Sequence, residues 1–379
     1  MKILFLSHTP LSSQFVVGSH HLVREFKKLG HEVRHVSIPV SLVDFLLKKN
    51  QVSSINKRGT FSNNRKTEYS EQIDIVPFNL LPWSIWCKLP FGINFSIKMA
   101  SAFSFFLEFK KEHFDIVFMD EPSLLPILTK IKYDKLVYRP TDIYSEMFPE
   151  RKLDLLEDKI LRLADKVVAT SNPVAKYYSN IYQGEVLCVE NGVNLELFTT
   201  KPFNVPDVII PEGMNVVYVG ALDYRFGFDI LNHVAADHPS INFLLLGPVE
   251  ENIKKSFSHL TNVYFYGSIA QQFLPYFFSK SDFGILPLSD HPANAGRSPM
   301  KLYEYASLGL PVISSFTDEL SHRNLPFVFL SKNKEEFSGH INKLKVTDLS
   351  SVSNVAHEIA LEQDWVAKAK LIIEYALSA

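Results

Sequence analysis

Short apolar runs alternate with amphipathic segments along the chain. Runs that end in Gly, Pro or polar residues are typical of buried parallel strands, and the segments between them are typical of covering helices. We expect strands at Lys2–Ser7, Glu32–Ile38, Phe114–Met119, Lys135–Tyr138, Lys166–Thr170, Val186–Val189, Asn215–Val219, Asn242–Leu246, Val263–Tyr266, Gly284–Leu288, Val312–Ile313 and Phe327–Leu330. The opening strand–helix–strand unit predicts an α/β protein with a doubly wound sheet. The length of 379 residues suggests about two domains.

The stretch Gly284–Ser315 predicts a strand, a polar loop, a short helix and a second strand. Ser298 is a candidate cap for a helix that begins at Pro299, since proline lacks the N–H that the first turn leaves unpaired. Gly309 ends this helix, and Pro311 prevents its continuation.

Two ionisable residues of this helix suggest a ligand. Lys301, Glu304 and Tyr305 share one face at spacings of three and four residues. A helix N-terminus at the edge of a parallel sheet favours an anion, Lys301 adds a positive charge, and Glu304 can accept hydrogen bonds from sugar hydroxyls. Phosphate with ribose is therefore the expected ligand. The alternative is an ordinary amphipathic helix on which Lys301 and Glu304 form a solvated pair.

The segment Pro299–Val312 resembles the nucleotide-sugar site of GT-B glycosyltransferases of the family 4 type, and its Met-Lys-Leu form is also similar to the family 70 glucuronosyltransferases. Weaker likeness extends over Glu190–Phe198 and Val217–Asp229. The resemblance implies two Rossmann-like domains whose parallel sheets face each other across a deep cleft. We place an acceptor domain at residues 1–196, a nucleotide-sugar domain at 197–362 and a helix that packs back on the first domain at 363–379.

The same resemblance, with the positions of strand ends, suggests the residues that contact the donor. They are Lys301, Glu304, Arg225, Met300, Leu302, Gly220, Gly247, Gly267 and Arg297. Gly247 and Gly267 could equally serve only to end strands. Arg297 could pair with the carboxylate of a uronic acid. Two departures from the family pattern matter: Phe226 stands where a lysine is usual, and Gly296 stands where many retaining members carry a glutamate. The second departure favours inversion.

An inverting transfer needs a carboxylate that takes the proton of the acceptor hydroxyl. Asp142 is our candidate, because it follows the strand Lys135–Tyr138 and because Tyr138-Arg139-x-x-Asp142 resembles the family 70 segment that carries the base. Asp142 could instead cap a helix. Asp120 and Glu121 are further candidates by the same geometry.

The loop after the first strand is a candidate contact for the acceptor or the diphosphate. It contains Gly18, His20 and His21, and it follows the strand end at which ligands of such sheets bind. The alternative is that the two histidines are only surface polar residues.

The composition and the absence of certain motifs indicate the kind of protein and the cellular compartment that we expect. The formal net charge of −2 argues against a nucleic-acid binder, and two distant cysteines argue against a disulfide framework. No signal peptide, spanning segment or D-x-D motif is evident, so we expect a cytoplasmic protein with no bound metal. Basic residues near aromatic ones suggest contact with the inner face of the cell membrane; they are Lys48, Lys49, Lys57 and Arg58. The Phe-rich segment Phe91–Phe109 nearby could instead be a helix whose Phe95, Met99, Phe103 and Phe106 belong to the core.

Together with the resemblance, these observations predict a metal-independent glycosyltransferase that needs no cofactor beyond its donor, which we expect to be a UDP-sugar. The acceptor would be a glycan or a polyprenyl-linked oligosaccharide used in surface polysaccharide synthesis. The alternatives are a nucleotide-sugar epimerase with the same fold and a non-catalytic carbohydrate-binding subunit.

Overall fold

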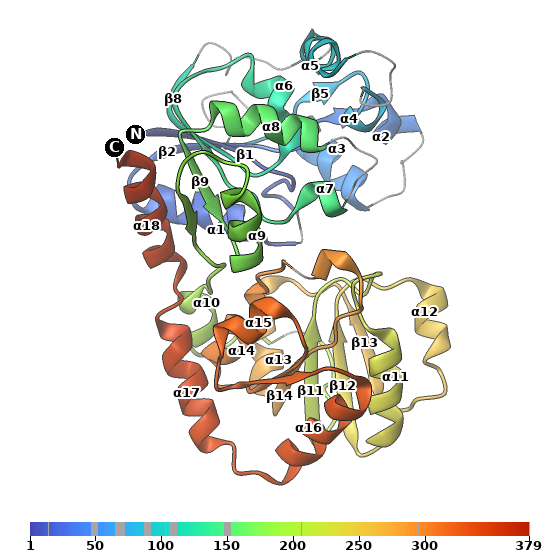
Figure 1. Ribbon diagram of the computed structural model, residues 1–379. Coiled ribbons are helices and arrows are strands. Elements are labelled where there is room, and N and C mark those ends of the chain that lie inside the picture. The colour runs from blue at the N-terminus through green and yellow to red at the C-terminus, as the bar shows by residue number, and fades with distance from the viewer. Residues whose placement is uncertain are drawn as a thin grey trace. The chain divides into compact units, whose positions relative to one another are not determined.

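The computed structural model describes residues 1–13, 15–46, 52–64, 73–86, 92–102, 104–105, 112–147, 153–205, 207–294 and 296–378. The chain forms two compact units (Figure 1). The first contains Met1–Glu190 and Ala369–Ala379, and the second contains Asn191–Lys368. The predicted boundaries lay at residues 196 and 362.

The first unit is built on a seven-stranded sheet with the order β10-β9-β8-β7-β1-β2-β4, and every strand pair in it is parallel. Its strands are β1 (Lys2–Leu6), β2 (Glu32–Val36), β4 (Asp74–Ile75), β7 (His113–Met119), β8 (Lys132–Tyr138), β9 (Lys166–Ala169) and β10 (Val186–Cys188). The two-residue strand β4 was not predicted, because two residues carry no periodicity. A small sheet of β3 (Val40–Ser41), β5 (Phe78–Asn79) and β6 (Ser104–Phe105) accompanies the large one.

Helices cover the sheet of the first unit. They are α1 (Gly18–Lys28), α2 (Leu42–Leu46), α3 (Val52–Asn64), α4 (Trp83–Trp86), α5 (Ile93–Ala102), α6 (Leu125–Leu128), α7 (Tyr144–Met147), α8 (Leu153–Leu163) and α9 (Asn172–Ser179). Phe26 of α1 packs on Phe5 and Phe118 of the central strands, at ring-centroid distances of 5.6 and 5.3 Å. This aromatic contact holds the second half of α1 against β1 and β7.

The second unit contains a six-stranded parallel sheet with the order β13-β12-β11-β14-β15-β16. Its strands are β11 (Met214–Val219), β12 (Ile241–Leu246), β13 (Val263–Gly267), β14 (Phe283–Leu286), β15 (Val312–Ser315) and β16 (Val328–Ser331). Its helices are α10 (Leu195–Thr199), α11 (Phe228–Asp237), α12 (Glu251–Ser256), α13 (Leu274–Ser279), α14 (Met300–Ser307), α15 (Asp318–Arg323), α16 (Lys334–Val346) and α17 (Ser350–Leu361). The strand order reverses between β11 and β14, and ligands of open α/β sheets bind at the carboxyl ends beside such a reversal.

The last helix, α18 (Trp365–Leu377), supplies the final segment of the first unit. Ile372 and Ala376 are buried there. The hydroxyl of Tyr375 donates to the carbonyl of Glu185 at 2.7 Å, and the ammonium of Lys135 donates to the carbonyl of Ala376 at 3.1 Å. The chain therefore returns to the unit in which it began.

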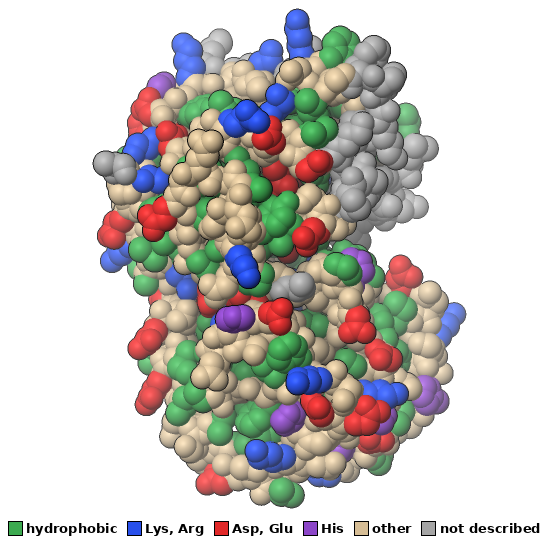
Figure 2. Space-filling view, viewed as in Figure 1, with side chains coloured by type: hydrophobic (Ala, Val, Ile, Leu, Met, Phe, Trp, Pro, Cys, Tyr) green, Lys and Arg blue, Asp and Glu red, His purple; other side chains and the backbone are tan. Residues whose placement is uncertain are grey.

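Two of the basic residues expected at a membrane make contacts within the first unit. Lys57 forms an ion pair of 2.9 Å with Asp44, and Arg58 donates to the carbonyl of Asp44 at 2.6 Å. Lys48 and Lys49 lie outside the described residues. On the face drawn in Figure 2, basic and acidic side chains are interspersed. Among the described helices, none combines the length and apolar character that crossing a bilayer requires.

Candidate functional site in the second unit

Helix α14 is held against the sheet by Tyr305. The ring of Tyr305 lies on Gly284 of β14, where an added Cβ would come within 2.6 Å of a ring carbon. The Tyr305 hydroxyl accepts a hydrogen bond of 2.9 Å from the backbone N–H of Val219, at the end of β11. The helix thus spans the two strands between which the sheet order reverses. It ends as predicted at Gly309, whose φ of 75° is in the left-handed region.

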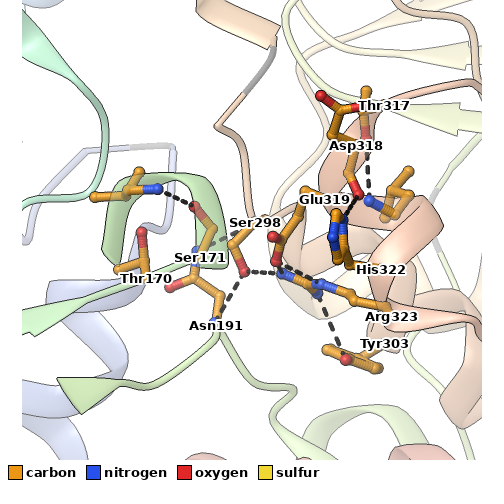
Figure 3. Close-up of polar contacts among 12 residues, drawn as sticks. Thr170, Ser171, Asn191, Ser298, Tyr303, Thr317, Asp318, Glu319, His322 and Arg323 are labelled. Carbon is orange, nitrogen blue, oxygen red and sulfur yellow. Dashed lines mark hydrogen bonds and ion pairs between the residues drawn. The ribbon is translucent and has the colours of Figure 1, made fainter. Parts of the chain in front are cut away.

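The predicted capping role of Ser298 was wrong. Helix α14 begins at Met300, its N-cap position is Pro299, and no side chain among the described residues caps it. The Ser298 hydroxyl instead accepts hydrogen bonds from the backbone N–H of Asn191 at 3.1 Å and from Arg323 at 2.9 Å (Figure 3). Both partners are distant in sequence, so local capping rules could not reveal them.

A pocket lies beside the start of α14. It is lined by Tyr218, Leu286, Leu288, Asn294, Arg297, Pro299, Lys301, Thr317 and Leu320. These residues come from the carboxyl ends of β11 and β14, from the loop before α14, from α14 itself and from the start of α15. Of the expected donor residues, Lys301 and Arg297 line it. The other lining residues were not among the expected donor contacts; Tyr218, Leu286, Leu288, Thr317 and Leu320 carry no sequence signal beyond a position at or shortly after a strand end.

Lys301 and Glu304 lie in a setting that disfavours both of their charges. Burial lowers the pKa of Lys301 to about 8, and the positive charge of Arg297 adds to this effect. Burial raises the pKa of Glu304 to about 7, against the opposing effects of Lys301 and of a hydrogen bond from Gln271. Glu304 is only 6% exposed, so the alternative of a solvated surface pair was wrong. A bound anion near Lys301 would favour its charged form.

Arg225 already has a carboxylate partner. Its guanidinium binds Asp223, with Nε at 3.0 and 3.1 Å from the two carboxylate oxygens. Although burial opposes the change, the hydrogen bonds from Arg225 lower the pKa of Asp223. The Arg225 carbonyl accepts from the side chain of Asn294 at 2.9 Å, and Asn294 in turn accepts from Arg297 at 3.4 Å. Arg225 thus belongs to the loop framework that holds Arg297.

The three glycines expected near the donor have different surroundings. A Cβ on Gly247 would lie 1.7 Å from the carbonyl oxygen of Gly220, so Gly247 allows two loops to approach each other. A Cβ on Gly220 would lie 2.8 Å from Cε of Lys301, so Gly220 makes room for the lysine. Gly267 has a φ of 69°, and no described atom lies within 4 Å of the position that a Cβ would take there. Leu302 is buried in the core cluster of the second unit, and Met300 is half-buried.

In the first unit, Asp142 lies between β8 and α7 and is half-buried. Its Oδ2 accepts a hydrogen bond of 3.2 Å from the hydroxyl of Thr141. Glu121 is buried and accepts a hydrogen bond of 3.0 Å from the backbone N–H of Ser123. The Glu121 carboxylate therefore caps the short turn that follows β7.

Asp120, at the end of β7, is buried and forms an ion pair with Arg139. Burial raises the pKa of Asp120, and Arg139 opposes the rise. The carbonyl of Asp120 accepts a hydrogen bond of 2.7 Å from the hydroxyl of Tyr144. These contacts tie the ends of β7 and β8 together beside Asp142.

The histidines of α1 are not surface residues, so that alternative was wrong. Gly18 begins the helix, and His20 and His21 are buried in its first turn. Burial lowers the pKa of His20 to about 4 and that of His21 to about 3. His20 Nε2 lies 3.0 Å from the carbonyl oxygen of Thr9. Both rings are neutral at pH 7.

Comparison with known proteins bears on the fold of the chain. Residues 213–345 match the family model described as glycosyl transferases group 1. Over its whole length the chain is similar to the sucrose-phosphate synthase of Thermosynechococcus elongatus, with 16% identity, a TM-score of 0.71, and coverage of 99% of this chain and 98% of that one. The chain has the GT-B fold. The fold class and the resemblance to GT-B glycosyltransferases are thereby confirmed.

Two further proteins similar to this GT-B chain are informative. The Anabaena protein Alr3699/HepE, solved in complex with UDP and glucose, is 17% identical with a TM-score of 0.65, and the alignment covers 99% of each chain. TuaH of Bacillus subtilis (strain 168), named as a putative teichuronic acid biosynthesis glycosyltransferase, is 25% identical over 274 residues. That alignment covers 66% of this chain and 69% of TuaH.

Proposed function

We propose that the protein is a glycosyltransferase that binds a nucleotide diphosphate sugar, a UDP-sugar, in the pocket of the second unit. The observation that carries the proposal is the placement of Lys301 and Arg297 in a pocket beside the strand-order reversal, with the buried Glu304 one turn along α14. Two cations suit a diphosphate, and a buried carboxylate suits the paired hydroxyls of a ribose. The group 1 family match and the UDP complexes of HepE support it.

The pocket's charges suggest how the residues act during transfer. As the bond between the anomeric carbon and the diphosphate oxygen breaks, negative charge grows on the leaving group, and Lys301 and Arg297 stabilise it. We assign to these side chains the task that a metal ion performs in other transferases. In the inverting reaction that we propose, the acceptor oxygen attacks the anomeric carbon and Asp142 receives its proton.

We also propose which sugar is transferred and which acceptor receives it. Arg297 is a candidate partner for the carboxylate of glucuronic acid, and a hexose is the alternative. The teichuronic acid biosynthesis for which TuaH is named supports an acceptor used in surface polysaccharide synthesis, either a glycan or a polyprenyl-linked oligosaccharide. We place the reaction in the cytoplasm, at the inner face of the membrane. Proton NMR of the product would give its anomeric configuration and test inversion.

Calorimetric titration of UDP, GDP, ADP and TDP tests the donor site. We expect one nucleotide, UDP, to bind selectively and Glu304→Ala to weaken its binding about tenfold or more, because two hydrogen bonds to a charged acceptor are lost. Glu335→Ala, at an exposed position of α16, is the matched control and should bind like the unmodified protein. Failure of the unmodified protein to bind any of the four nucleotides would contradict the proposal.

A further inference from the structure

Ser298 joins two segments that are far apart in sequence. Its hydroxyl accepts the backbone N–H of Asn191 at 3.1 Å and a guanidinium N–H of Arg323 at 2.9 Å. Its carbonyl accepts the side-chain amide of Asn191 at 2.8 Å. Figure 3 shows these side chains directed toward one another. The hydroxyl oxygen and the carbonyl oxygen of Ser298 therefore both accept hydrogen bonds that hold this residue in place.

The Arg323 end of this network is a buried ion pair. Arg323 and Glu319 lie four residues apart on α15, and their side chains are 3% and 0% exposed. Two guanidinium nitrogens of Arg323 donate to Oε1 of Glu319, at 2.8 and 2.6 Å. A desolvated guanidinium needs a partner for each remaining N–H, because its lost hydration is otherwise uncompensated. Ser298 is one such partner.

The network connects the two segments that form opposite walls of the proposed donor pocket. One wall is the segment Arg297–Lys301, which includes Ser298, and the other is the first turn of α15 with Thr317 and Leu320. Thr317 caps that turn by accepting the N–H of Leu320 at 3.2 Å. Arg323 is one turn beyond Leu320, so its bond to Ser298 connects α15 to the segment that carries both pocket cations.

We propose that Ser298, Glu319 and Arg323 are positioning residues that set the separation of the two pocket walls and thereby the affinity for the donor diphosphate. The inference rests on the proposed function of the pocket. None of the three side chains lines it. Glu319 orients Arg323, Arg323 and Asn191 fix Ser298, and the peptide on either side of Ser298 then sets where Arg297 and Lys301 point.

The test is UDP affinity by calorimetry in Ser298→Ala, Ser298→Thr and a matched control. We expect Ser298→Ala to weaken UDP binding about tenfold, since a hydrogen bond to a charged group is lost, and Ser298→Thr to retain the affinity because it keeps the hydroxyl. Ser331→Ala removes a similarly buried hydroxyl at the end of β16 and should leave UDP affinity unchanged. Thermal midpoints are measured in parallel. Equal UDP affinity in Ser298→Ala and the unmodified protein would overturn the proposal.

Arg323→Lys keeps the test decisive if Ser298→Ala fails to fold. Lysine retains the charge opposite Glu319, but its single ammonium cannot reproduce the forked geometry that serves Glu319 and Ser298 together. We expect weakened UDP binding in a folded protein, and unchanged binding would again overturn the proposal. If the unmodified protein itself fails to bind UDP, the proposed function of the pocket fails, whereas a loss confined to these variants supports the positioning role.

Discussion

At the scale of single residues, burial brings the pKa values of Lys301 and Glu304 close to neutral pH. Burial lowers the pKa of Lys301 to about 8 and raises that of Glu304 to about 7. Lys301 therefore loses its charge as the pH rises through 8, and Glu304 gains its charge only as the pH rises through 7. In the donor binding that we propose, Lys301 and Glu304 both act in their charged forms.

We accordingly predict that affinity for UDP-glucose is greatest between about pH 7 and 8 and falls on both sides. The intact sugar nucleotide is the suitable probe, because its diphosphate does not titrate in this range. On the acid side the loss should be absent in Glu304→Gln, and on the alkaline side it should be absent in Lys301→Arg, since guanidinium stays charged. An affinity that does not vary from pH 6 to pH 9 would show that these two groups do not contact the donor.

At the scale of elements, the position of α14 depends on the contact between Tyr305 and Gly284. An alanine Cβ at residue 284 would come within 2.6 Å of the Tyr305 ring, which is itself held by its hydrogen bond to Val219. The ring and the strand cannot both keep their places, so α14 would shift and carry Lys301 with it. The helix therefore links core packing to the pocket that Lys301 lines.

Gly284→Ala should lower the free energy of unfolding by about 1–3 kcal/mol, as overpacked cores do, and should weaken UDP binding. Gly339→Ala in α16 is the matched control, because no described atom lies within 4 Å of its added Cβ. That control should stabilise the protein by about 0.5–1 kcal/mol through a better helix propensity. Chemical denaturation measures the stability of both variants. A Gly284→Ala variant as stable as the unmodified protein would disprove the role given to the Tyr305 contact.

At the scale of the whole molecule, two units with separate cores share one chain, and the end of α18 completes the first unit. Ile372 is 1% exposed, whereas its neighbour Leu371 is 45% exposed. Ile372→Ala should lower the stability of the first unit by about 2–4 kcal/mol, and Leu371→Ala should change it by less than about 0.5 kcal/mol. Calorimetric melting in the presence of UDP separates the units, because UDP stabilises only the unit that binds it.

We expect Ile372→Ala to lower the melting transition that UDP does not raise. A drop confined to the UDP-sensitive transition would instead assign the end of α18 to the stability of the second unit. Leu371→Ala is the control for helix α18 itself, because it changes an exposed residue of the same helix. If both variants lowered the transition equally, the effect would come from a weakened helix and not from the lost packing of Ile372.

The sequence by itself determined the alternation of strands and helices, the end of α14 at Gly309 and the shared face of Lys301 and Glu304. Each of these depends on residues within a few positions of one another, so periodicity, glycine and spacing carry the information. The resemblance over Pro299–Val312 added the GT-B fold, which the comparisons confirm.

Only the tertiary structure decided which partners those residues meet. Ser298 bonds to Asn191 across 107 positions of the chain, Gly247 makes room for the carbonyl of Gly220, and the first turn of α1 buries His20 and His21. The short strand β4 forms by pairing with the edge of β2. Lys57 is directed to Asp44 by the ion pair between them. Such contacts are set when distant segments pack, and the free energy of that packing is not a property of any local stretch.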